Sequence, residues 1–242
     1  ITTIGENAFK VRVHLASIEI PNSVTSIEFS ALAACYSLTS ITIPKSVTNI
    51  GLVITLESHS ISSIVIDSEN PIYDSRENCN AIIETATNTL VTGCHNTIIP
   101  NTVTRIGDYA FYKCTEVTSI NMPTTLTAIG EKAFAQDTKL ACEIILPASM
   151  TTIASRAFFN CQAVTAFHIE ATTPPTIPND AFERTTAPIH VPCGYGHVYG
   201  KHTQWGVLNL EMCELLQDNV YYYPIDGHTA RAVTYQSNPT DT

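Results

Sequence analysis

The chain has 242 residues, of which 44% are hydrophobic and 14% are charged, so it can bury a core and lacks the composition of a disordered chain. Twelve Lys and Arg residues against 22 Asp and Glu residues give a formal net charge of -10, which disfavours nucleic acid and anionic lipid as partners. The sequence shows no apolar run long enough for a membrane span and no leader segment at its start.

Two independent series of residues recur along the chain at steps of 23 or 24 residues, with one longer step of 56. One series is an isoleucine ahead of an Ala-Phe pair or its equivalent: Ile4, Ile27, Ile50, Ile106, Ile129, Ile153 and Ile177. The other is a proline that closes an apolar run: Pro21, Pro44, Pro100, Pro123 and Pro147. Because the two series agree, the chain is predicted to consist of structural repeats.

Each repeat carries the apolar spacing of a leucine-rich repeat, as in Leu38, Ile41, Ile43, Val47 and Ile50. The alternating, β-branched part predicts a short strand that pairs in parallel with its neighbours. The Ala-Phe pair predicts a short helical turn on the opposite face, with the Phe filling the core. The expected fold is a β-rich leucine-rich-repeat solenoid of the α/β horseshoe type, stable only through stacking of its units.

The segments SVTSI, IGDYAFYKC and SINMP resemble the BspA-like leucine-rich-repeat family of bacterial cell-surface proteins. The resemblance covers roughly residues 1–205 and rests on motifs that recur along the chain. It implies an extracellular or cell-surface protein that adheres to a host or bacterial surface protein or glycan. We expect the export signal to precede residue 1, because Ile1 already lies inside a repeat.

The long step of 56 residues places an insertion at residues 67–97. Two strand-like stretches, 80–84 and 89–93, flank a polar turn at 85–88 and predict a β-hairpin, which we expect to be dispensable for folding because loop insertions cost little closure entropy. Cys79 and Cys94 are equidistant from the centre of this hairpin. A disulfide between them and two buried thiols are both open alternatives.

The end of the chain departs from the repeat. Residues 183–205, which include Trp205, are similar to the terminal unit of the resembled family and should cap the core of a solenoid that spans 1–205. In 206–242, stretches at 219–224 and 231–235 around Asp226-Gly227 predict another hairpin and a loose tail, with the start of another module as the alternative.

Catalytic and metal motifs are missing. The sequence holds no nucleophile elbow, phosphate-binding loop or zinc-protease motif, and its carboxylates do not pair at a recurrent position, so we predict no enzyme and no cofactor. Cys35, Cys114 and Cys161 recur three residues after the core Leu or Phe and should pack in the core. The segment of His190, Cys193, His197 and His202 matches no standard zinc spacing, so we predict no metal.

The strand register predicts a row of outward-facing residues, one from each unit. This front row comprises Glu19, Thr42, Val65, Ile98, Asn121, Ile145, His168 and His190. Its aliphatic members are larger than idle surface positions require, which favours a docking surface, although β-branched residues also simply suit a strand. Adjacent His168 and His190 should make one end pH-sensitive. The hypothesis is a non-catalytic adhesion or interaction module, and the alternative is a structural spacer or self-association module.

Overall fold

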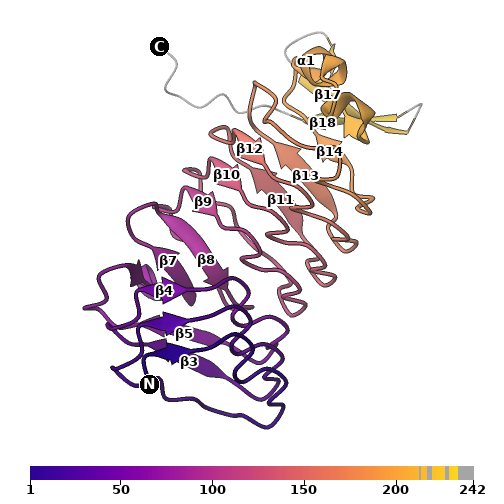
Figure 1. Ribbon diagram of the computed structural model, residues 1–242. Coiled ribbons are helices and arrows are strands. Elements are labelled where there is room, and N and C mark those ends of the chain that lie inside the picture. Colours follow the sequence, from indigo (N-terminus) through magenta and orange to yellow (C-terminus); the bar gives the residue numbers. More distant parts are fainter. Residues whose placement is uncertain (213, 217–219, 227–228, 234–242) are drawn as a thin grey trace.

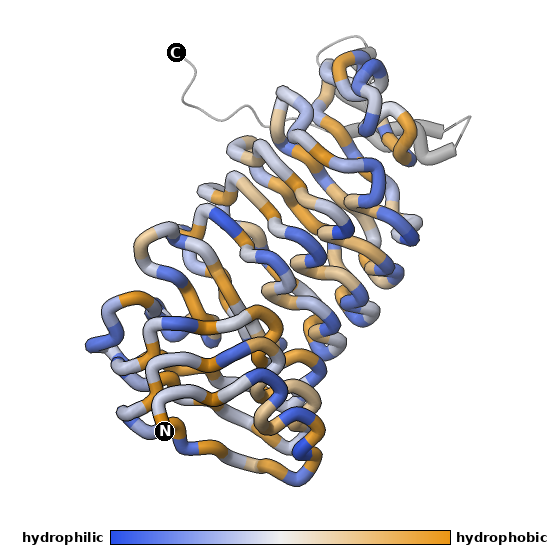
Figure 2. The backbone as a smooth tube through the Cα atoms, in the orientation of Figure 1, coloured by the Kyte–Doolittle hydropathy of each residue, from blue (hydrophilic) through white to orange (hydrophobic). Residues whose placement is uncertain are grey.

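The computed structural model describes residues 1–212, 214–216, 220–226 and 229–233, with side chains described up to 212. The chain winds into coils that stack along one axis, with β3 and β5 toward the N-terminal end and β11, β13 and β14 toward the C-terminal end (Figure 1). Hydrophobic residues concentrate along the strands of the C-terminal coils, and hydrophilic residues at the turns (Figure 2). The predicted solenoid is therefore confirmed.

Each coil contributes short parallel strands to two sides of the solenoid. The front strands are β3 (Ser40–Ile43), β5 (Ser63–Ile66), β11 (Glu143–Leu146), β13 (Ala166–Ile169), β14 (Ile189–His190) and β15 (Leu210–Glu211). The side strands are β1 (Thr3–Ile4), β2 (Ser26–Ile27), β4 (Asn49–Ile50), β9 (Arg105–Ile106), β10 (Ala128–Ile129) and β12 (Thr152–Ile153). Equivalent isoleucines pair from coil to coil, as Ile4 does with Ile27, so the repeat register found in the sequence is the register of the sheets.

The third side of each coil is built of turns and differs from the helical turns predicted there. In the coil around Phe111, the flanking Tyr109 and Lys113 have φ of 59° and 57°, which no α-helix tolerates. The backbone N–H of Phe111 donates to the carbonyl of Ala133 in the next coil, at 2.8 Å. Because every second backbone donor of this turn bonds to the next coil, the consecutive hydrogen bonds of an α-helix cannot form.

Stacked phenylalanines form the core of the C-terminal coils. The ring centroids of Phe111 and Phe134 lie 5.1 Å apart, and those of Phe134 and Phe158 lie 5.3 Å apart. Phe182 continues the stack at 5.5 Å from Phe158. The predicted core position of the Phe is confirmed, and in the N-terminal coils a fully buried Leu32 takes the same place.

A column of small polar side chains runs beside this core, at the position where the sequence repeats its cysteines. Each of four members donates a hydrogen bond to a backbone carbonyl of the preceding coil: Cys35 to Phe9, Ser58 to Leu32, Cys161 to Phe134 and Thr185 to Phe158. The thiols of Cys35 and Cys161 are fully buried, and burial raises the pKa of both. The prediction of core packing is confirmed for Cys35 and Cys161, whereas Cys114, the third predicted member, is only partly buried and packs against the edge of the C-terminal core.

The inserted segment contains β6 (Tyr73–Asp74), the 3-10 helix η1 (Arg76–Asn78), β7 (Ala81–Glu84) and β8 (Thr89–Gly93). The predicted hairpin is present as β7 and β8, but β8 also pairs in parallel with β9 and β6 pairs with β7, so all belong to one six-stranded sheet. Ile83 and Leu90 pack into the C-terminal core, whereas Ile82 packs into the N-terminal core. The premise of a simple loop insertion is therefore wrong, because the hairpin joins the two cores, and we now expect its removal to disrupt folding.

Cys79 and Cys94 are both free thiols, which is the alternative of two buried thiols. A β-bulge shifts the register between Ile82 and Ile83, and a one-residue shift turns side chains to the opposite face. Accordingly, Cys79 packs in the C-terminal core and Cys94 in the N-terminal core. The symmetric hairpin assumed from the sequence places the two sulfurs opposite each other, and the bulge removes that symmetry.

The C-terminal end of the core is closed by α1 (Gly196–Lys201) and the 3-10 helix η2 (Trp205–Val207). The fully buried Trp205 donates from Nε1 to the carbonyl of Pro175 at 2.7 Å, and the Tyr199 hydroxyl donates to the carbonyl of Ala171 at 2.6 Å. This geometry fits the predicted cap. Because β15 pairs with β14, however, the front strands continue beyond residue 205.

The last described strands are β16 (Glu214–Leu216), β17 (Val220–Asp226) and β18 (Thr229–Val233). β17 pairs antiparallel with both β16 and β18, as the hairpin predicted around Asp226-Gly227 requires. The centre of that turn, at 227–228, and the predicted tail at 236–242 lie outside the described residues.

Candidate interaction surface

The front face is the outward side of the front strands. In β3 and β11 the side chains alternate between exposed and buried, as the period of a half-buried strand requires. The parallel register places Thr42 beside Val65, and Ile145 beside His168, which in turn lies beside His190. These members of the front row are therefore brought together in two groups.

The other members of the front row do not join a continuous ladder. Glu19, Ile98 and Asn121 are exposed but lie outside the strands. The backbone N–H of Ile98 donates to the carbonyl of Cys79 in the inserted segment, so the coil that follows the insertion pairs with a non-repeat neighbour. The prediction of their outward orientation is confirmed, whereas the unbroken sheet assumed for the row is wrong.

Three aliphatic side chains of the front row are exposed to solvent. Val65 is 46% exposed, Ile98 74% and Ile145 51%. They lie on separate segments of the front face, so they provide three apolar contact points along the solenoid and no single patch. Such points suit a long partner better than a compact one.

The two histidines of the front row form a stacked pair. Their ring centroids are 4.6 Å apart with an interplanar angle of 12°. Glu143 Oε2 lies 3.2 Å from His168 Nε2, and Glu211 Oε2 lies 3.3 Å from His190 Nδ1. The adjacency of the histidines was predicted from the register, but the two glutamates that flank them were missed.

The two glutamates differ in how far the sequence places them on the front face. Glu143 stands two residues before Ile145 on β11, so strand alternation alone puts it on the same face. Glu211 lies on β15, beyond the residue at which the solenoid was predicted to end, and it pairs with His190. A longer repeat series at the C-terminal end is the signal that would have found it.

Burial and a neighbouring charge act together on His190. Burial lowers the pKa of His190, and the positive charge of a protonated His168 lowers it further. The carboxylates of Glu211 and Glu143 raise this pKa but do not outweigh the other two effects. His190 is therefore neutral at pH 7 and takes up a proton only below the usual range of a histidine near 6.5.

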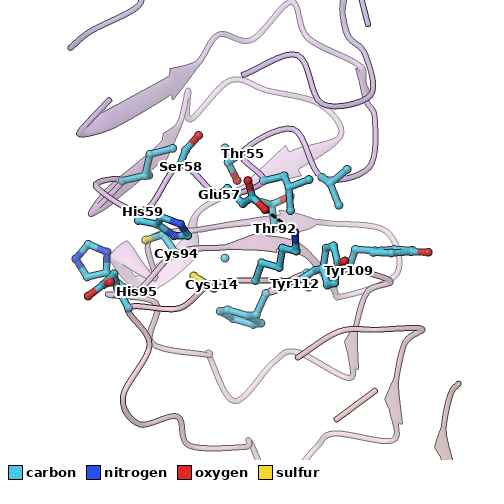
Figure 3. A pocket seen from close by; sticks show the side chains of 18 residues that line it. Thr55, Glu57, Ser58, His59, Thr92, Cys94, His95, Tyr109, Tyr112 and Cys114 are labelled. Atoms are coloured by element: carbon cyan, nitrogen blue, oxygen red, sulfur yellow. Dashed lines mark hydrogen bonds and ion pairs between the residues drawn. The ribbon is translucent and has the colours of Figure 1, made fainter. Parts of the chain in front are cut away.

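A cavity lies at the junction between the N-terminal and C-terminal coils (Figure 3). Its volume is about 30 Å³, roughly a tenth of the smallest typical small-molecule pocket. The ammonium of Lys113 forms an ion pair with Glu57 within it. Burial raises the pKa of the Cys94 and Cys114 thiols that line it, so neither has the lowered pKa of a reactive cysteine.

The histidine-rich segment near residue 190 offers no thiolate to a metal. Cys193 is disulfide-bonded, which removes the one soft ligand of that segment. Among the residues that the structure describes, no three His, Cys, Asp or Glu side chains are grouped so that they could hold a metal ion. Chemistry in this part of the molecule therefore depends on charge and shape.

The repeated coil, its two parallel sheets and its capped core define a leucine-rich-repeat solenoid. Six copies of the BspA type leucine rich repeat region match the chain, over residues 2–94 and 87–190. The chain therefore belongs to the BspA-type leucine-rich-repeat family. No curated protein matches its sequence.

Two solved structures share this fold. The pneumococcal vaccine antigen PcpA is 19% identical, with a TM-score of 0.61 over 88% of this chain and 64% of that one. A leucine rich cell surface protein from Faecalibacterium prausnitzii is 26% identical, with a TM-score of 0.57 over 85% of this chain and 59% of that one. This chain thus spans less than two thirds of either. In its described part, no helix has the length and apolarity needed to cross a bilayer.

Proposed function

We propose that this chain is a non-catalytic adhesion or protein-interaction module of an extracellular or cell-surface protein, and that its partner docks on the front face. The observation that carries the proposal is the exposure of Val65, Ile98 and Ile145, of which Val65 and Ile145 are turned away from the core by strand alternation. Burial of apolar surface is the main favourable contribution to most protein association. The cell-surface relative at 26% identity supports the location.

The side of the solenoid that carries the side strands is less suited to binding, because hydroxyl groups just ahead of these strands are engaged within the solenoid. The Thr127 hydroxyl donates to the carbonyl of Thr104 at 3.0 Å, and the Thr151 hydroxyl donates to the carbonyl of Thr127 at 2.9 Å. Each of these donors therefore already has an acceptor in the neighbouring coil. The many Ser and Thr residues of the repeat serve in part as links between coils.

The proposal is tested by binding to immobilised extracellular-matrix proteins, mucin and glycans. The front-face variant replaces Ile98, Ile145 and His168 together by Ser. A matched control replaces Phe29 and Leu52 by Ser, because both are apolar and similarly exposed but lie off the front face. We expect a protein of the panel to bind the native chain and the control, and the front-face variant to lose binding while its melting temperature is kept.

Two outcomes contradict the proposal. Unchanged binding by a folded front-face variant would exclude this face as the docking surface. Failure of every panel member, together with a light-scattering mass of a dimer that only the front-face variant breaks, would favour self-association of the solenoid.

A further inference from the structure

The solenoid pairs most of its permanent positive charges with carboxylates, either within one coil or across neighbouring coils. All seven Lys and Arg residues between positions 45 and 156 take part in ion pairs. Lys139 and Glu116, one coil apart, are an example at 2.8 Å. Most of these cations therefore have an internal partner, and the net charge of -10 resides in the carboxylates that lack one.

Glu143 and Glu211 depart from this pattern, because the basic groups beside them in the described part of the chain are imidazoles. Glu143 contacts His168, and Glu211 contacts His190. Their side chains remain 63% and 33% exposed. With a neutral imidazole beside it, a carboxylate keeps its full negative charge toward solvent.

The two carboxylates lie at opposite edges of the stacked rings. The strand order is β11, β13, β14 and β15, and the register aligns Ile145, His168, His190 and Glu211 in one row, with Glu143 two residues before Ile145 on β11. Three strand steps of about 4.8 Å and two residues of about 3.3 Å along the strand separate Glu143 from Glu211 by about 16 Å. The rings lie between the two negative charges, and Ile145 lies beside Glu143 on the same face.

We propose that this end of the front face, formed by Glu143, Ile145, His168, His190 and Glu211, binds a basic and aliphatic extended segment of a partner protein. The inference rests on the proposed function and specifies the partner. Its basis is charge complementarity, since neither carboxylate pairs with a Lys or Arg among the residues whose side chains the structure describes, and the whole chain is acidic. In an extended segment, residues four apart are separated by about 13 Å, so two long lysine side chains at these positions can reach both glutamates.

Acidification reduces the negative charge that the partner meets. Among the described side chains, the titratable groups that face His190 are His168 on β13, Glu211 on β15 and Glu143 on β11. When His190 takes up a proton, its contact with Glu211 becomes an ion pair within the chain, and this carboxylate no longer needs a cation from outside. Because the pKa of His190 is lowered, binding of a basic segment should be strongest at neutral pH and weaken as the pH falls below about 6.5.

The probe is a synthetic peptide of alternating threonine and valine that carries two lysines four residues apart, and its control carries glutamates in their place. Binding is measured by fluorescence anisotropy at physiological ionic strength, which screens distant charges. The site variant is Glu143→Gln with Glu211→Gln. The matched control is Glu6→Gln with Glu77→Gln, which removes the same net charge at exposed positions elsewhere.

We expect the lysine peptide to bind the native chain and the control, and to bind the site variant about tenfold more weakly. We also expect native binding to weaken severalfold from pH 7.5 to 5.5, and a His190→Gln variant to lose this pH dependence. No binding of the lysine peptide, equal binding of the glutamate peptide, or an equal loss in the control would overturn the inference. A pH dependence that survives in the histidine variant would overturn it as well.

The two proposals fail separately. If a panel protein needs the front face but the lysine peptide does not bind, the basic partner is wrong and the docking surface stands. If the peptide behaves as expected but every panel protein ignores the front face, the proposed function is wrong, while the preference of this end for basic segments is supported.

Discussion

Asp137 occupies a position in the polar column where other coils have Cys, Ser or Thr, and this predicts an unusual dependence of stability on pH. Its side chain is fully buried, and its Oδ1 accepts a hydrogen bond from the backbone N–H of Cys114 at 2.7 Å. Its Oδ2 has no hydrogen-bond partner among the described residues. Burial raises the pKa of Asp137 well above its usual value, against the smaller lowering effect of the Cys114 N–H.

Because the pKa is raised in the folded state, the protein takes up a proton when it folds at a pH between the unfolded and the folded pKa. The stability contributed by this proton is complete below the unfolded pKa, near 3.9, and is lost as the pH rises toward the folded pKa, at up to about 1.4 kcal/mol per pH unit. Asp137→Asn keeps the acceptor for Cys114 and cannot ionise, so we expect it to be more stable than the native chain at pH 8, by a margin that grows with pH by up to about 1.4 kcal/mol per unit.

The assay is urea unfolding of the native chain and Asp137→Asn at pH 5, 6.5 and 8. The difference in the free energy of unfolding should grow as the pH rises. Glu77→Gln serves as the control, because Glu77 is exposed and surface substitutions usually change stability by less than about 0.5 kcal/mol. If the difference in the free energy of unfolding stays constant over this pH range, or if Asp137→Asn is less stable than the native chain at pH 8, then Asp137 is not a neutral buried carboxyl in the native chain.

Four further predictions concern the core and the junction. Phe134→Ala should destabilise by about 3 to 5 kcal/mol because it opens the middle of the phenylalanine stack, as measured by denaturant unfolding; a loss below about 1 kcal/mol would contradict that stack. Trp205→Phe should lower the free energy of unfolding by about 1 to 3 kcal/mol because it leaves a buried carbonyl without its donor, and an unchanged melt would argue against the cap. A chain that joins residue 66 directly to residue 96 should lose cooperative unfolding by circular dichroism, whereas a native-like melt would show the hairpin to be dispensable. Cys79 and Cys94 should both be alkylated in denatured, unreduced protein, and a cross-linked peptide between them in the mass spectrum would contradict the bulged register.

The regular part of the fold could be predicted from the sequence because the coils repeat the same geometry. The isoleucine and proline series fix the repeat, and the strand alternation fixes which side chains point outward, as at Ile145. The buried Phe111 follows from the same pattern. Each of these features is local to one unit and is repeated, so a departure from the pattern in one unit does not hide the pattern of the others.

The remaining features depend on contacts between coils, which the pattern within one unit does not show. The turns around Phe111 are not helical because their N–H groups bond to the next coil. The bulge at Ile82 and Ile83 changes the placement of Cys94 by a single residue. Glu211 joins the candidate surface only because β15 adds a strand beyond the recognised repeats.

The most direct test of the proposed docking surface is hydrogen–deuterium exchange of this chain, alone and with a protein captured from the binding panel. The account predicts that exchange slows in the front strands, above all in β11, β13 and β14, whose outward side chains include Ile145, His168 and His190. Slower exchange confined to the turns around Phe111 or to the side strands, with the front strands unchanged, would contradict it.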